Sequence, residues 1–163
     1  MNDLFAPPGN SWRPVAPQLG TMRRLVLSAS AVVGLVGIVV LHLILDLPTW
    51  LLVLAIAAVV TLAVLGWLVI GRNTRSWGYA ERDEDLYIKH GATFRELIAV
   101  PYGRMQFVDI TSGPLERAFG IASVRLHTAS PGTSARIPGL PKEEAARLRD
   151  SLTSLGEAQA AGL

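Results

Sequence analysis

Four polar residues in the second half of the chain carry side chains suited to binding a charged or hydrogen-bonding group. They are Arg104, Gln106, Arg117 and Arg125. An arginine presents a planar fork of donors that fits a carboxylate or a phosphate, so these positions are candidate contacts for a protein partner or an anionic lipid headgroup. A structural role is the more ordinary interpretation, because arginines on strands are usually solvated or paired locally.

The other ionisable residues do not predict a metal centre. His42, His90 and His127 are widely separated, which is not the spacing of a zinc site. The acidic run at residues 81–85 is either a weak cation site or a solvated hairpin loop, and the loop is the favoured interpretation. The chain has no cysteine, which excludes disulfides, thiolate nucleophiles and zinc–thiolate sites. We therefore expect neither a metal nor a cofactor.

No sequence motif predicts catalysis. The chain contains no glycine-rich phosphate loop, nucleophile elbow or His–Glu helix motif. Its net charge is +2 and its pI is about 9.4, but the basic excess lies beside the apolar segments. The high pI is thus not evidence for nucleic-acid binding. We expect a protein that is not an enzyme and does not bind nucleic acid.

Two long apolar runs are the elements that must position the rest of the chain. Residues 25–45 would form a helix of roughly 31 Å, the thickness of a bilayer's hydrocarbon core. Residues 49–70 form a second run of similar length that carries no charge. Only Asp46, Leu47 and Pro48 separate the runs, and such a short link forces an antiparallel hairpin of two transmembrane helices.

Arginines at the outer ends of the two runs predict the orientation of this hairpin. Arg23 and Arg24 precede the first run, Arg72 and Arg75 follow the second, and the connecting loop has no lysine or arginine. Because positive charge is retained on the cytoplasmic side, we expect a multi-pass protein with both termini in the cytoplasm. The same arginines are expected to anchor the helices at anionic headgroups.

His42 and Asp46 are four residues apart near the end of the first run, so their side chains can meet on one helix face. One interpretation is a proton or ion relay inside the membrane. The favoured interpretation is a pair of polar residues at the outer membrane interface in contact with water, because functional ionisable groups usually lie deeper.

After residue 75 the long apolar runs give way to short alternating segments. This pattern predicts an α+β domain over residues 76–156, between a disordered N-terminal segment at 1–24 and a disordered tail at 157–163. The expected strands are residues 77–82, 86–90, 93–100, 105–111, 122–128 and 135–137, with a helical turn within 112–120. A helix is expected at 142–155, bounded by Pro141 and Gly156, with one apolar stripe that packs on the sheet.

Three stretches follow the apolar runs in a distinctive order: LYIKHG, VPYGRMQFVDITSGPLERAFGIASVRLHTAS and IPGLPKEEAARLRDSL. Together with the paired membrane helices, they resemble the bacterial pleckstrin-homology proteins of the YdbS-like membrane class. The resemblance covers about residues 25–155. It implies a bacterial plasma-membrane protein with a pleckstrin-homology-like fold, a mostly antiparallel partial β-barrel capped by a C-terminal helix. It implies no activity, because this fold serves many unrelated functions.

We expect the domain to act as an interaction module tethered at the cytoplasmic face. A core of about 80 residues is marginal alone, which favours assembly with another copy or with related domains of other membrane proteins. The alternative is a domain that senses anionic lipid or envelope stress. The resemblance does not extend to phosphoinositide recognition, because the early turn Lys89-His90-Gly91 carries a single lysine instead of a basic cluster.

Overall fold

The structure, a computed structural model, describes residues 12–128 and 135–160. It contains two compact units. One is the helical hairpin, Gly20–Arg72. The other is a domain that combines the segment ending at Leu19 with Asn73–Leu163.

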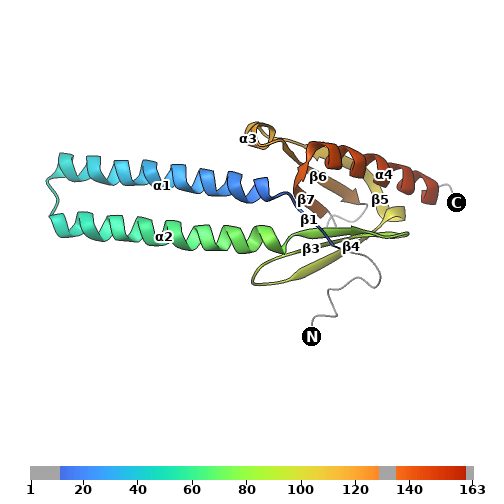
Figure 1. The fold of residues 1–163 in the computed structure, drawn as a ribbon, viewed down its shortest axis with the longest axis horizontal. Helices are drawn as coiled ribbons and strands as arrows, with labels where there is room; N and C mark the ends of the chain where they lie inside the picture. The colour runs from blue at the N-terminus through green and yellow to red at the C-terminus, as the bar shows by residue number, and fades with distance from the viewer. Residues whose placement is uncertain (1–11, 129–134, 161–163) are drawn as a thin grey trace. The chain divides into compact units, whose positions relative to one another are not determined.

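The hairpin consists of α1 (Pro17–Leu45) and α2 (Thr49–Ser76), which run antiparallel (Figure 1). Both helices are long and apolar enough to cross a membrane. Small residues let them approach closely: a Cβ atom added to Gly66 would lie 2.9 Å from Leu27 Cδ2. Large apolar side chains such as Val33 and Leu43 remain exposed on the outside of the hairpin, as lipid-facing residues should be.

A short turn joins the two helices. Asp46 has a φ of 46°, a left-handed conformation that aspartate adopts more readily than most residues. The N–H of Leu51 donates to the Pro48 carbonyl at 3.0 Å and starts α2. No hydrogen bond or ion pair joins His42 to Asp46 in the described part of the chain.

The domain contains two antiparallel sheets. The first has the order β1 (Arg13–Pro14), β2 (Gly78–Glu81), β3 (Asp85–His90) and β4 (Glu96–Pro101). The second has the order β5 (Met105–Thr111), β6 (Ile121–Thr128) and β7 (Ala135–Pro141). A 3-10 helix, η2 (Tyr102–Arg104), links the sheets, and α3 (Pro114–Ala118) links β5 to β6.

Helix α4 (Lys142–Ala160) caps the domain and contacts β5, β6, β7 and η2 (Figure 1). Its apolar stripe is buried at Ala145, Leu148 and Leu152. These side chains complete a core to which both sheets contribute, with Leu86 and Leu126 fully buried. The expected fold class, a two-helix membrane anchor followed by antiparallel sheets and a C-terminal helix, is confirmed.

Several expected boundaries differ from the structure. The strand expected at 93–100 begins only at Glu96, because residues 91–95 form the turn after β3. The last strand extends to Pro141, beyond the expected end at residue 137. Helix α4 continues through Gly156 to Ala160. The prediction of a disordered tail at 157–163 is therefore wrong for residues 157–160. Residues 161–163 lie outside the described residues. Packing of α4 against β5 and η2 outweighs the weak helix propensity of Gly156.

The largest correction concerns the N-terminal segment, which the sequence predicted to be disordered over residues 1–24. Residues 1–11 lie outside the described residues, but the rest is ordered. Arg13 and Pro14 pair with β2, and the N–H of Ala16 donates to the Gly139 carbonyl at 2.9 Å. Helix α1 starts at Pro17 and not at residue 25, and Leu19 in its first turn is only 2% exposed.

Gly139 makes this docking possible. Its φ is +65°, which suits glycine, and a Cβ atom added here would lie 2.7 Å from Leu19 Cβ. The lack of a side chain thus permits both the backbone conformation of β7 and the close approach of the first turn of α1.

Gly139→Ala is expected to destabilise the domain more than Gly120→Ala. Both glycines have positive φ, 65° and 68°, so alanine costs about 1–2 kcal/mol of backbone strain at either position. Nothing lies within 4 Å of the new Cβ at Gly120, whereas collision with Leu19 at Gly139 adds about 1–3 kcal/mol. Thermal unfolding of the full chain in detergent measures the difference. Equal destabilisation by the two substitutions would contradict the docking of Leu19 on Gly139.

Candidate functional site

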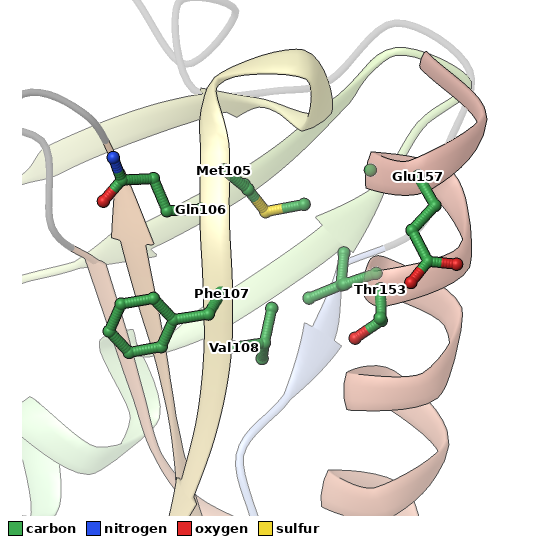
Figure 2. A pocket seen from close by; sticks show the side chains of 8 residues that line it. Met105, Gln106, Phe107, Val108, Thr153 and Glu157 are labelled. Atoms are coloured by element: carbon green, nitrogen blue, oxygen red, sulfur yellow. The ribbon is translucent and has the colours of Figure 1, made fainter. Parts of the chain in front are cut away.

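A groove of about 210 Å³ runs between β5 and α4 (Figure 2). Strand β5 is the outermost strand of its sheet and pairs only with β6 among the described strands. Its other edge adjoins the groove and leaves backbone donors and acceptors without a strand partner. The lining comes from both elements: Met105, Gln106, Phe107 and Val108 of β5, and Leu152, Thr153, Gly156 and Glu157 of α4.

A β-bulge determines how β5 presents its side chains. Met105 pairs with Thr128 and Phe107 pairs with His127, so Gln106 is an extra residue without a cross-strand partner. Figure 2 shows Met105 and Val108 pointing toward α4, and Gln106 and Phe107 pointing to the other side of the strand. The groove therefore has an apolar floor.

The opposite side of β5 is also accessible. Phe107 is 51% exposed and stacks on His127, with the ring centroids 4.2 Å apart and the planes 11° from parallel. His127 Nε2 lies 3.5 Å from Asp109 Oδ2. An exposed aromatic ring and a carboxylate therefore lie together on this face of the β5–β6 pair.

A cluster of polar side chains holds α4, one wall of the groove, against the first sheet. Arg147 Nη2 donates to Glu81 Oε1 at 2.6 Å and to Glu144 Oε1 at 2.7 Å. Arg13 Nη1 and the Tyr79 hydroxyl also donate to Glu144 Oε1, at 3.0 and 2.5 Å. Glu144 is thus the shared acceptor that joins the N-terminal segment, β2 and α4.

The charge states of this cluster follow from its contacts. Hydrogen bonding from Arg147, ahead of that from Tyr79 and Arg13, lowers the pKa of Glu144 from 4.5 to about 2. Burial, followed by the hydrogen bond to Glu144, raises the pKa of Tyr79 to about 12. At neutral pH the cluster therefore contains an ionised Glu144 and a neutral Tyr79 that donates to it.

The structure does not gather the predicted contact residues into one site. Gln106 of β5 is among the lining residues of the groove, although its side chain points to the other side of the strand, and Arg104 ends η2 just before it. Arg117 lies on α3 and Arg125 on β6, and both are exposed. The side chains of these three arginines form no hydrogen bond or ion pair with the residues that the structure describes. Their role as contacts stays a prediction.

Sequence reasoning overlooked Glu116, the neighbour of Arg117. Its carboxylate accepts from the Gly113 N–H at 2.9 Å and from the Ser123 hydroxyl at 2.9 Å, and Arg136 Nη2 lies 3.7 Å away. A glutamate three residues after the start of a helical turn is a known capping pattern, so the Gly-Pro-Leu-Glu sequence carried this signal. The motif has a structural role in fixing α3 on β6.

Of the juxtamembrane arginines, Arg23 and Arg24 lie in the N-terminal part of α1, and Arg72 and Arg75 lie in the last turns of α2. The guanidinium of Arg24 stacks over Trp67, 4.6 Å from the ring centroid, and occupies the space beside Gly71. Arg23 is partly buried, whereas Arg72 and Arg75 are exposed. Their contact with lipid headgroups stays a prediction. In the described ranges, no three His, Asp or Glu side chains are grouped so that they would hold a metal ion.

Comparison with known proteins identifies the family. The sequence model of the bacterial PH domain matches residues 25–155. The chain belongs to the bacterial PH domain family. It is also similar to the UPF0699 transmembrane protein YdbS of Bacillus subtilis (strain 168), with 28% identity over 149 residues that span 91% of this chain and 92% of that protein. No solved structure matches.

These comparisons agree with the architecture. The match to the bacterial PH domain begins at residue 25, so it includes both apolar helices as well as the sheets and α4. The similar Bacillus protein is described as a transmembrane protein. This chain is therefore a membrane protein that carries a bacterial PH domain behind a two-helix anchor.

Glu144→Gln is expected to lower the free energy of unfolding by about 1–3 kcal/mol at pH 7, because it removes the charged acceptor of Arg147 and Arg13. The native pKa of Glu144 lies below its ordinary value, so its stabilising contribution is complete above about pH 4.5 and disappears as the pH falls toward 2. The difference between wild type and variant should therefore shrink over that range. Denaturant titrations at several pH values measure it, and a pH-independent difference would contradict the assigned charge state.

Proposed function

We propose that this bacterial PH domain is a non-enzymatic interaction module, anchored in the membrane, whose β5–α4 groove binds an extended segment of a partner protein. The unpaired edge of β5 beside the groove is the observation that carries the proposal. A segment added to this edge would pair with its free backbone groups and direct every second side chain into the groove. Backbone pairing supplies affinity, and the groove supplies selectivity.

The lining defines the chemistry of that segment. Met105, Val108 and Leu152 favour apolar side chains, and the carboxylate of Glu157 at one end of α4 favours a basic residue. The volume of about 210 Å³ suits one or two side chains better than a cofactor-sized ligand. The expected partner therefore contributes a strand with alternating apolar residues and at least one lysine or arginine.

The location of the module follows from the hairpin. Strand β1 precedes α1 and pairs with β2, which follows α2, so one domain holds both ends of the hairpin. Together with Arg23, Arg24, Arg72 and Arg75, this pairing supports a multi-pass topology with the domain and both termini in the cytoplasm. Partners are then other membrane proteins with cytoplasmic segments, including a second copy of this chain or proteins with related domains.

A basic headgroup-binding pocket is a weaker alternative. The first hairpin turn of the domain, between β2 and β3, contains Asp83, Glu84 and Asp85 beside a single Arg82. An anionic phosphate would be repelled from this turn. The acidic charge of this turn therefore disfavours a phosphoinositide-like ligand there.

Filling the groove tests the proposal. Thr153→Trp places a bulky side chain in the groove, whereas Ser154→Trp adds the same bulk at an exposed position of α4 that does not line it. We expect Thr153→Trp to abolish a complex that is crosslinked in native membranes and purified through a tag on this chain, and Ser154→Trp to leave it intact. Recovery of the wild-type chain only as a partner-free monomer, or equal loss in both variants, would contradict the assignment of the groove.

A further inference from the structure

The turn between β3 and β4 presents an unusual apolar side chain. Phe94 is 88% exposed, the most of any large hydrophobic residue that the structure describes. A single exposed apolar residue is common and by itself carries no functional meaning. The setting of Phe94 within the domain is what distinguishes it.

The turn has a defined shape. Gly91 has a φ of 96°, and a Cβ atom added there would collide with the carbonyl oxygen of Phe94. At the base of the turn, His90 Nε2 lies 3.4 Å from Glu96 Oε2, and these two residues are also paired across the strands. The backbone therefore holds Phe94 within a defined turn, and its side chain is not packed on its own domain.

Strand register places this turn at one particular end of the first sheet. Gly78, the first residue of β2, pairs with Lys89, the residue before the last of β3. Trp77, which follows directly after α2, stacks on His90 with the ring centroids 4.7 Å apart. The Phe94 turn thus lies at the end of the sheet where the chain arrives from α2, and the acidic turn at residues 82–85 lies at the other end.

Basic and aromatic side chains surround this end of the sheet. Lys89 Nζ lies 4.3 Å from the centroid of the Trp12 ring. Burial, followed by the positive charge of Arg95, lowers the pKa of Lys89. Arg95 itself is exposed and makes no side-chain ion pair with a described residue. The acidic side chain of Glu96 in this region faces His90.

We propose that the turn at residues 91–95 contacts the bilayer that the helices cross: Phe94 enters the boundary between headgroups and acyl chains, and Arg95 and Lys89 lie at anionic lipid phosphates. An aromatic ring flanked by cations is the combination that partitions into this boundary. The turn would give the domain a third attachment to the membrane, in addition to its covalent links to α1 and α2. This contact does not depend on the β5–α4 groove and is tested separately from it.

The chain contains no cysteine, so a single introduced cysteine can be labelled specifically. Thr93→Cys is exposed and leaves Phe94 in place, and Asp83→Cys provides a matched probe in the turn at the other end of the sheet. Each variant of the full chain is labelled with a small fluorophore and reconstituted in phosphatidylcholine vesicles with increasing phosphatidylglycerol. Quenching of the fluorophore by nitroxide groups on the acyl chains measures its contact with lipid, and quenching by iodide in solution measures its exposure to water.

We expect the probe at position 93 to be quenched by the lipid nitroxides, increasingly so with phosphatidylglycerol, and to be protected from iodide. The probe at position 83 should show the opposite behaviour. Phe94→Ser and Arg95→Glu should each reduce the lipid quenching at position 93 without changing the circular dichroism spectrum. Equal quenching at both positions would overturn the proposal. So would protection from iodide without lipid quenching, because that result would place Phe94 against protein.

Discussion

The pairing of a short N-terminal segment with the C-terminal domain is the constraint on which the rest of the structure depends. Arg13 and Pro14 add to the edge of β2, and the Ala16 N–H bonds to the Gly139 carbonyl. Helix α1 begins at Pro17 and α2 ends at Ser76, two residues before β2. The domain therefore holds both ends of the helical hairpin.

The same segment is linked to the wall of the candidate groove. Glu144 of α4 accepts hydrogen bonds from Arg13, Tyr79 and Arg147. One cluster of polar side chains therefore joins β1, β2 and α4. Hydrogen bonds from these three donors stabilise the ionised carboxylate of Glu144. Removing one donor therefore weakens the whole hydrogen-bond network. The position of α4 against β5 thus depends partly on residues that precede the first membrane helix.

The elements predicted correctly from sequence are those specified by local pattern. The two apolar runs were recognisable by length, β5 at residues 105–111 by alternation, and the start of α4 by Pro141 and its acidic first turn. The docked N-terminal strand has only two residues and adjoins prolines, so it has no periodicity to detect. Its order arises from contacts with Gly78 and Gly139, far away in sequence. Of the four predicted contact residues, only Gln106 is a lining residue of the groove. Residue charge in the sequence does not indicate which strand edge is left unpaired or which residue forms a β-bulge.

Hydrogen–deuterium exchange of the full chain tests the docking of the N-terminal segment most directly. We expect that the amide of Ala16, bonded to the Gly139 carbonyl at 2.9 Å, exchanges as slowly as the amides of β2. We also expect Gly139→Ala to accelerate exchange in residues 13–19 before it affects β6. Rapid exchange of residues 13–19 in the wild-type chain, with β2 still protected, would contradict the claim that one domain holds both ends of the hairpin.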